Sequence, residues 1–315
     1  MRFSPHPLSL RQLQYLVAIA ESGSFRAAAE LCHVSQPSLS SQVALAEAAL
    51  GVRVFERDRR RVLVTAAGQE VLRRARALLL AADDLVDATA QLGDPLAGRL
   101  RIGVIPTISP YFVPDVAAAL RRELPKLAVQ WWEDKTATLL ARLQSAELDA
   151  ILLALEADLG HVSHAVIGYD PFVLAAAPGH ALLARGRPLQ PEELSGVELL
   201  LLAEGHCLRD QALSACKRAT SSAFGATSLP TLVQMVLSGE AVTLLPTLSL
   251  GTENRRGELG TRTFAKPGLG RTLALVWRPA APSVELLEKV AALMARVGSG
   301  LLQPVPPAAA SRRGA

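Results

Sequence analysis

Residues 24–51, SFRAAAELCHVSQPSLSSQVALAEAALG, decide the fold of the N-terminal third of the chain. They predict an alanine-rich helix after Ser24, a tight turn at residues 33–34 and a second helix capped by Ser35, with Pro37 in its first turn. Upstream, apolar residues at helical spacing from residue 10 predict another helix that ends at Gly23. Short helices in this order form a helix-turn-helix pattern.

The helix after Ser35 is predicted to have one apolar and one polar face. Leu39, Val43, Ala46 and Leu50 recur at steps of three or four residues and predict a buried stripe. The N-terminal half then turns short hydroxyl and amide side chains outward, which suits base edges and phosphates in the major groove of double-stranded DNA. The candidate DNA-binding residues here are Ser35, Gln36, Pro37, Ser38, Ser40 and Gln42.

Residues 52–65, VRVFERDRRRVLVT, alternate like a β-hairpin and are rich in arginine. Five arginines against two acidic residues give the segment a net charge of about +3, which suits phosphate contact because neutralised phosphates release counterions. Alone, such a run is more often a solvated hairpin. Directly behind a helix-turn-helix pattern, a DNA-contacting wing is the better interpretation, with Arg57, Arg59, Arg60 and Arg61 as candidates.

Together, residues 24–68 resemble the winged helix-turn-helix of the LysR-type transcriptional regulators. The elements AA…SQPSLS, LG…FER and VT…G follow in the family's order and spacing. One departure is residues 44–46, Ala-Leu-Ala, where the family usually carries basic residues. The resemblance implies double-stranded DNA and RNA polymerase as partners.

Residues 68–92 predict one helix about 37 Å long, at 1.5 Å per residue. Small and apolar residues alternate steps of three and four, as in the seam of a short coiled coil. The alternative is a helix that packs on its own domain; in the LysR family the corresponding helix is a dimerising linker. The predicted seam is Ala75, Leu78, Ala82, Leu85, Thr89 and Leu92.

The C-terminal two-thirds alternate strands and helices. Residues 98–155 read as strand, helix, strand, helix, strand, which predicts a parallel sheet. A second alternating set spans about 170–267, and the strand and helix of 271–297 are predicted to return to the first sheet. The fold class is therefore α/β with an all-α-type N-terminal winged helix-turn-helix. The resemblance implies a regulatory domain of two α/β lobes, similar to periplasmic binding proteins, with the ligand site between them.

These patterns predict four segments: a DNA-binding domain at 1–67, a linker helix and hinge at 68–97, a regulatory domain at 98–300 and a disordered tail at 301–315. The chain of 315 residues has three cysteines and no apolar run near 18 residues, which excludes a disulfide framework and predicts no membrane partner. The N-terminus is not typical of a signal peptide. We expect a cytoplasmic protein, where thiols are held reduced.

Two of the cysteines, Cys207 and Cys216, lie in GHCLRDQALSAC, residues 205–216. Zinc sites usually pair cysteines two to four residues apart and need four ligands, so no metal and no cofactor is expected. Simple burial explains Cys32, on the apolar side of its helix. It explains Cys207 poorly, because a predicted helix start, His206 and Arg209 would lower the pKa of this thiol and favour the reactive thiolate.

If residues 207–216 form one helix, the two cysteines lie about 13 Å apart on opposite faces. A disulfide needs Cα atoms within about 7 Å, so this bond requires the segment to unwind.

The same segment resembles the redox centre of the peroxide-sensing branch of the LysR family. The resemblance implies that hydrogen peroxide oxidises Cys207 to a sulfenic acid and that Cys216 is the resolving thiol, in a homodimer or homotetramer. It also implies a peroxide pocket formed by Thr107, Thr136, His206, Arg209, Asp210 and Arg271.

Two other functions stay open at this stage. A LysR-type regulator of a small organic effector would not need the cysteine pair, and a thiol peroxidase or other enzyme would not need the DNA-binding third. We therefore expect a peroxide-responsive regulator that is not an enzyme.

Overall fold

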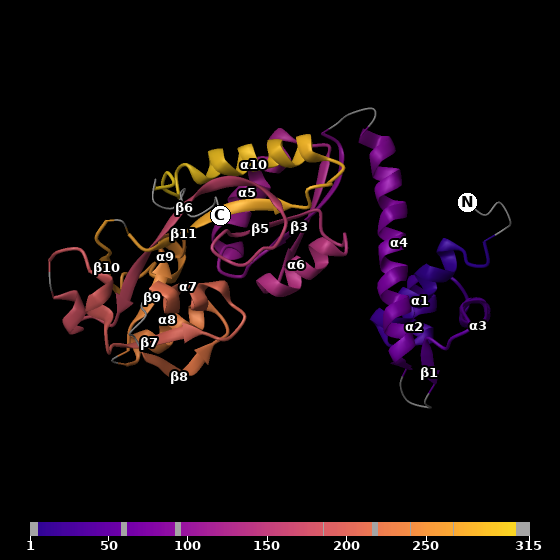
Figure 1. Ribbon diagram of the computed structural model, residues 1–315, viewed down its shortest axis with the longest axis horizontal. Coiled ribbons are helices and arrows are strands. Elements are labelled where there is room, and N and C mark those ends of the chain that lie inside the picture. The colour runs from indigo at the N-terminus through magenta and orange to yellow at the C-terminus, as the bar shows by residue number, and fades with distance from the viewer. Residues whose placement is uncertain are drawn as a thin grey trace. The chain divides into compact units, whose positions relative to one another are not determined.

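The computed structural model describes residues 6–57, 62–91, 96–184, 186–215, 220–239, 241–266 and 268–306. The chain divides into two compact units, Met1–Thr89 and Ala90–Ala315 (Figure 1).

The N-terminal unit begins with helices α1 (Leu10–Ser22), α2 (Phe25–Leu31) and α3 (Gln36–Leu50). A serine caps each helix: the side chains of Ser9, Ser24 and Ser35 accept backbone N–H groups from the first turns. Glycines in the left-handed conformation end α1 and α3, and the turn before α3 holds His33 at φ 54°. The predicted helix-turn-helix is confirmed.

Strands β1 (Phe55–Arg57) and β2 (Val62–Val64) pair antiparallel and form the hairpin. The Glu47 carboxylate accepts the backbone N–H groups of Val54 and Phe55, at 2.7 and 3.1 Å, and so ties the hairpin to α3. The candidates Arg59, Arg60 and Arg61 lie outside the described residues, as does the side chain of Arg57.

Helix α4 (Ala66–Gln91) follows the hairpin. Ala75 is buried in the core of the N-terminal unit, together with Leu72. The prediction that Ala75 belongs to an intermolecular seam is therefore wrong, because this part of α4 packs on its own unit. Further along, Leu78 and Leu85 are 55% and 68% exposed. The side chains of Thr89 and Leu92 lie outside the described residues.

The first lobe of the C-terminal unit contains β3 (Gly98–Val104), α5 (Ser109–Glu123), β4 (Leu127–Glu133), α6 (Thr136–Gln144) and β5 (Ala150–Ala154). Strands β4, β3 and β5 are parallel, as predicted. Strand β11 (Gly270–Trp277) returns from the second lobe and pairs antiparallel with β5, and α10 (Val284–Gly298) follows it (Figure 1).

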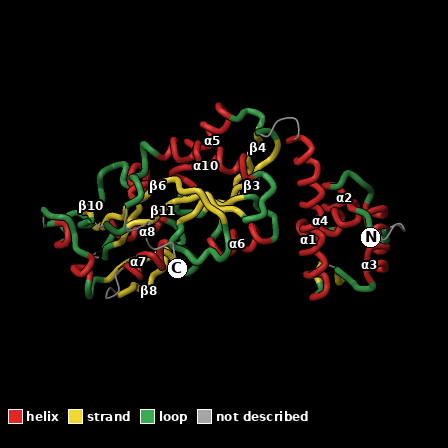
Figure 2. Tube along the Cα trace, turned by 45° about the horizontal axis from the view of Figure 1, so that its top comes forward, coloured by secondary structure: helices red, strands yellow, loops and turns green. Residues whose placement is uncertain are grey.

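The second lobe is built on the far half of β6 (Ser163–Ala176), a strand that the two lobes share (Figure 2). Its first half pairs with β11, and its second half with β9 (Thr243–Pro246) and β10 (Gly260–Thr263). The lobe also contains β7 (Glu198–Leu202), α7 (Cys207–Ala215), β8 (Thr220–Ala226), α8 (Leu229–Leu237) and α9 (Thr247–Glu253), with short 3-10 turns at Ala181–Leu183 and Pro191–Leu194. Strands β7 and β8 are parallel.

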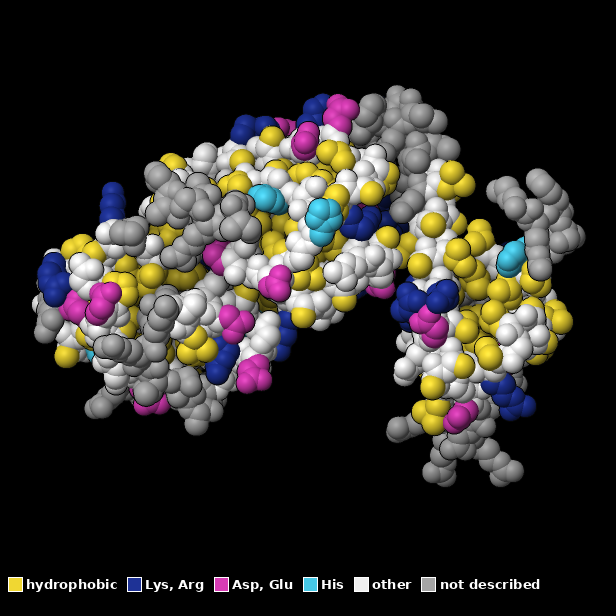
Figure 3. Space-filling view, in the orientation of Figure 1, with side chains coloured by type: hydrophobic (Ala, Val, Ile, Leu, Met, Phe, Trp, Pro, Cys, Tyr) yellow, Lys and Arg dark blue, Asp and Glu magenta, His cyan; other side chains and the backbone are white. Residues whose placement is uncertain are grey.

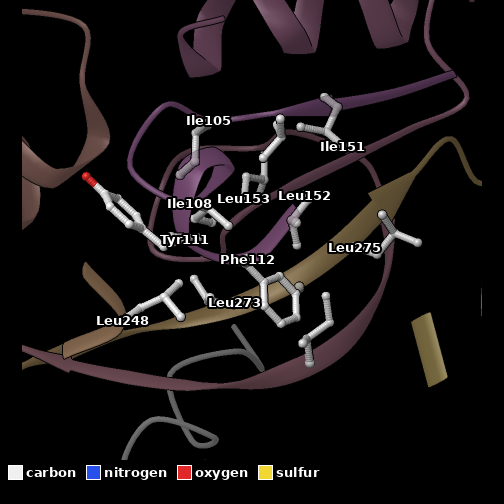
Figure 4. Packing of buried hydrophobic residues seen from close by; sticks show 14 of the residues in the cluster. Ile105, Ile108, Tyr111, Phe112, Ile151, Leu152, Leu153, Leu248, Leu273 and Leu275 are labelled. Atoms are coloured by element: carbon white, nitrogen blue, oxygen red, sulfur yellow. The ribbon is translucent and has the colours of Figure 1, made fainter. Parts of the chain in front are cut away.

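A hydrophobic core fills the first lobe and continues into the second. In Figure 4, Phe112 lies among Leu273, Leu275 and other aliphatic side chains of the central strands, while the Tyr111 hydroxyl points away from them. This core fixes the carboxyl ends of the first lobe's strands, which carry the site described below.

The predicted disordered tail begins too early. Leu302 is buried against Gly168, and Gln303 pairs with Tyr169, so residues 301–306 are part of the folded unit. The reason is local packing, since Leu302 fills the space that Gly168 leaves. Residues 307–315 lie outside the described part of the chain. Within the described ranges, we find no helix with the length and apolarity needed to span a bilayer.

Candidate functional site

A small pocket lies between the two lobes of the C-terminal unit. The first lobe lines it from the loop after β3 and the start of α6, and the second lobe from the segment that leads into α7. About 170 Å³ of this pocket is free of protein atoms. Its lining residues are Ile105, Pro106, Thr107, Lys135, Thr136, Gly205, His206 and Cys207.

Cys207 is the first residue of α7 and is only 9% exposed. It follows Gly205, whose φ of +86° turns the chain sharply before the helix. The helix start brings the backbone N–H of Leu208 to the sulfur. The thiol therefore sits in the pocket wall at the positive end of a short helix.

Arg271 on β11 is fully buried and reaches across to the pocket. Its Nη1 donates to Thr107 Oγ1 at 2.6 Å and its Nη2 to the Thr107 carbonyl oxygen at 2.9 Å. Its Nε and Nη2 both lie 3.0 Å from Asp170 Oδ2. The guanidinium is thus fixed between one pocket residue and one buried carboxylate.

Thr136 supplies a hydroxyl that lacks a partner. Its Oγ1 is buried and makes no hydrogen bond of normal geometry in the described structure. It is nevertheless close enough to the Cys207 sulfur to favour the thiolate. A buried polar group without a partner is costly, so this hydroxyl is suited to a small polar ligand.

The net effect on Cys207 differs from the sequence prediction. Burial raises the pKa of this thiol, and the charge of Arg271, the Thr136 hydroxyl and the Leu208 N–H oppose that rise without cancelling it. The prediction of a lowered pKa is therefore wrong, because the sequence does not reveal how completely the thiol is buried. The cation that most favours the Cys207 thiolate is Arg271, which lies 64 positions after Cys207 in the sequence, and not Arg209.

His206 is buried beside the thiol, and burial lowers its pKa, helped by the positive charge of Lys135. Its imidazole is therefore neutral near pH 7 and does not supply the positive charge that the sequence prediction assigned to it. Lys135 donates from Nζ to the Glu204 carbonyl oxygen at 2.8 Å, across the boundary between the lobes.

Two regions of the chain match known families. Residues 10–69 match the family described as "Bacterial regulatory helix-turn-helix protein, lysR family", and residues 93–299 match "LysR substrate binding domain". The chain belongs to the LysR family of transcriptional regulators.

Relatives place it in the OxyR branch of that family. It is 40% identical over 294 residues to the "DNA-binding transcriptional dual regulator OxyR" of Escherichia coli K12, covering 92% of this chain and 96% of the relative. It is 41% identical over 278 residues to the "Hydrogen peroxide-inducible genes activator" of Pectobacterium carotovorum, covering 87% and 92%.

Solved structures of OxyR proteins are also similar to this chain. A full-length OxyR variant from Pseudomonas aeruginosa has a TM-score of 0.74 at 34% identity, covering 96% of this chain and 100% of that one. A hydrogen-peroxide-bound OxyR mutant from Corynebacterium glutamicum has a TM-score of 0.65 at 32% identity, covering 98% and 96%.

The structure of this LysR-type regulator separates two of the predicted pocket residues from the rest. Arg209 donates from Nη1 to the Leu202 carbonyl oxygen, and Asp210 is exposed. Neither lines the pocket, and the charge of Asp210 raises the pKa of Cys207. Thr107, Thr136 and His206 line the pocket, and Arg271 holds it through Thr107.

Cys216 lies outside the described residues, one position after α7 ends at Ala215. The described parts of the chain contain no group of three or more His, Cys, Asp or Glu residues that could hold a metal ion. Cys32 is half-buried at the end of α2, where burial raises the pKa of its thiol.

The DNA-reading candidates lie on one end of α3. Leu39, Val43 and Ala46 are buried as predicted, whereas Leu50 is only partly buried. Of the candidates, Ser35, Gln36, Pro37 and Ser38 are exposed and Ser40 and Gln42 are half-buried. Gln42 accepts a hydrogen bond from Gln12 at 3.1 Å, so α1 holds part of its amide.

Sequence reasoning missed two polar residues, Lys135, which lines the pocket, and Asp170, which pairs with Arg271. Lys135 stands in EDKT beside the predicted Thr136, a neighbourhood that could have drawn attention to it. Asp170 gives no local signal, because its role depends on the strand register that pairs it with Arg271.

Proposed function

We propose that this chain is a transcription regulator that responds to hydrogen peroxide through Cys207. Oxidised Cys207 forms a disulfide with Cys216, the 207–216 segment refolds, and DNA binding changes. The observation that carries the proposal is the placement of Cys207 in a small pocket lined by Thr107 and Thr136, with the buried charge of Arg271 directed toward it.

The first chemical step takes place in that pocket. Cys207 loses its proton, the thiolate sulfur attacks one peroxide oxygen, and the O–O bond breaks to leave a sulfenic acid and hydroxide. Arg271 stabilises the thiolate, and the unpartnered Thr136 hydroxyl binds the peroxide. His206 is in the neutral form that can accept the thiol proton and return it to the hydroxide as water.

The second step supplies the switch. The Cys216 thiolate attacks the sulfenic sulfur, hydroxide leaves with a proton as water, and a disulfide forms. Because α7 separates the two residues along its length, the helix must unwind before their Cα atoms come within about 7 Å. The chemical event thereby becomes a conformational one.

The chemical character of the pocket favours peroxide over an organic effector. The pocket converges on the Cys207 thiol and on the Thr136 hydroxyl, a buried polar group suited to a small polar ligand.

The same proposal extends to partners and location. The chain binds double-stranded DNA through α3 and the hairpin, acts with RNA polymerase in the cytoplasm, and is a regulator and not an enzyme. Exposed apolar residues of α4, Leu78, Leu85 and Val86, form its contact in a homodimer or homotetramer. Figure 3 shows hydrophobic side chains exposed over the N-terminal unit.

The direct test uses the full-length reduced protein and a DNA fragment selected from a random pool. We expect one equivalent of peroxide to give a Cys207–Cys216 linked peptide in non-reducing peptide mapping, with a change in affinity for that fragment. Affinity that is the same before and after oxidation contradicts the proposal. Continuous peroxide consumption with a thiol reductant and no DNA indicates a peroxidase instead.

A further inference from the structure

Asp170 is a completely buried carboxylate that the proposed chemistry does not use. It lies on β6 directly opposite Arg271 on β11, in the register of the antiparallel pair. Its Oδ2 receives two guanidinium nitrogens at 3.0 Å. A buried charge pair of this kind fixes both partners, because neither can find water elsewhere.

The other oxygen of Asp170 is held by the start of α9. Oδ1 accepts the Thr247 hydroxyl at 3.1 Å and the Leu248 backbone N–H at 3.0 Å. The carboxylate is therefore shared: one oxygen faces Arg271, and the other faces two donors that draw part of its negative charge away.

Arg271 is also hydrogen-bonded to the pocket residue Thr107, and these bonds do not involve Asp170. Its two bonds to Thr107 fix the guanidinium on the pocket side. In a buried site, a charge is felt strongly at neighbouring groups, so a carboxylate that touches the guanidinium weakens its effect on the sulfur.

We propose that Asp170 is a positioning residue for Cys207 that acts through Arg271: its carboxylate, paired with the guanidinium that Thr107 holds at the pocket, offsets part of the arginine's charge at the thiol. The inference rests on the proposed function only in taking Cys207 as the reacting thiol. The reactivity of Cys207 then depends on the Arg271–Asp170 ion pair and not on Arg271 alone. It also depends on the α9 groups that donate hydrogen bonds to the Asp170 carboxylate.

Other charged and titratable groups also surround this network. They are His206 and Asp210 on the Cys207 segment, Lys135 at the start of α6, Tyr111 on α5 bonded to Glu253 on α9, Tyr169 beside Asp170 on β6, and Glu156, which accepts the Thr272 N–H. The substitutions below leave all of them unchanged.

The test measures how the rate of Cys207 alkylation by iodoacetamide depends on pH, in the full-length reduced protein, with peptide mass spectrometry to assign the site. In Asp170→Asn, the bonds to Thr107 still hold Arg271 while the opposing charge is gone. We expect the midpoint of the profile to move down by about one pH unit. An unchanged or higher midpoint overturns the proposal.

Asp170→Asn leaves a buried arginine without its counter-charge, which can prevent this variant from folding. A second variant therefore tests the proposal without removing the ion pair. Thr247→Val keeps the side-chain shape and removes one donor from Oδ1, so the carboxylate offsets Arg271 more fully. We expect the midpoint to rise by a few tenths of a pH unit. A midpoint equal to that of the parent, or lower, refutes the proposal.

Asp149→Asn is the matched control. It breaks the ion pair with Arg101, in which Asp149 Oδ1 lies 2.8 Å from Nη2, and neither residue lines the pocket. We expect no shift; a shift equal to that of Asp170→Asn means that the effect is not specific to Arg271, and the proposal fails.

Alkylation does not require peroxide, so the two proposals can fail separately. If the parent Cys207 does not react with peroxide, the proposed function is wrong. If the parent reacts with peroxide and the alkylation profile of either variant matches that of the parent, only the role of Asp170 is wrong.

Discussion

The candidate DNA-reading end of α3 and the proposed redox pocket differ in how the chain builds them. The α3 surface comes from one continuous segment, residues 35–42, and needs only a capped helix with a buried stripe. The pocket gathers residues from three separate segments, and Arg271 supports it from a fourth. A surface of the first kind can be inferred from periodicity, whereas the second kind depends on strand register.

The two regions also differ in whether their polar side chains are exposed or buried. On α3 the candidate polar side chains face water or are half-buried, so changing most of them costs little stability. Ser35 is the exception, because it caps the helix and its loss costs about 1 kcal/mol. At the pocket, Thr107, Arg271 and Asp170 are buried, and Arg271 is hydrogen-bonded to each of the other two. We therefore expect substitutions of these three residues to change function and stability together.

The largest effect is expected from the cysteines of the redox region. Cys207→Ser should abolish peroxide consumption and the redox-linked change in DNA binding, because it removes the reacting sulfur. Cys216→Ser should still form a sulfenic acid, which dimedone traps and intact-mass spectrometry detects, but no disulfide. Cys32→Ser is the control and should respond as the parent does. A response that survives Cys207→Ser would reverse the roles assigned here.

A large effect is also expected on assembly. Leu78→Asp combined with Leu85→Asp should dissociate the dimer, because both side chains are exposed on α4 and charge in an apolar seam is costly. Light scattering measures the mass. Leu31→Asp, at a residue that is 65% exposed on α2, should leave the mass unchanged. A parent mass for the double variant would place the contact elsewhere.

An intermediate effect is expected from the arginines of the hairpin. Replacing Arg59, Arg60 and Arg61 by Ala should flatten the slope of log K against log salt by up to about 2.7, since each phosphate contact contributes about 0.9. Fluorescence anisotropy at several salt concentrations measures it. Replacing Arg121, Arg122 and Lys126, exposed in the other unit, removes the same charge and should leave the slope nearly unchanged. Equal slopes for both triple variants would remove the hairpin from the interface.

The smallest effect concerns Gln211 on α7. Its amide oxygen and nitrogen are both buried without a hydrogen-bond partner in the described structure. Gln211→Leu should raise the free energy of unfolding of the reduced protein by about 1–2 kcal/mol, measured by urea denaturation, because the desolvation cost of the amide disappears. Gln36→Leu, at an exposed position of α3, should change it by less than about 0.5 kcal/mol. A loss of stability in Gln211→Leu would show that the amide has a partner in solution.

Much of the architecture was predictable from local signals. Serine caps, Pro37 and the glycines after α1 and α3 mark the helix ends, and the alternation of strand and helix after residue 98 predicts the parallel sheet. Thr107, Thr136, His206 and Arg271 were predicted through the family resemblance. The coiled-coil pattern was less informative, because a stripe at steps of three and four looks the same whether a helix packs on its own unit, as Ala75 does, or on a partner.

The sequence by itself determined the helix-turn-helix, the family and the segment that contains Cys207, because these depend on spacing within short stretches. Only the tertiary structure decided the electrostatics of the thiol. Burial raises the pKa of Cys207, Arg271 opposes that rise from a distant strand, and Asp170 faces Arg271 through strand register. Desolvation and Coulomb interactions depend on distance in space, so the neighbours of Cys207 along the chain could not reveal them.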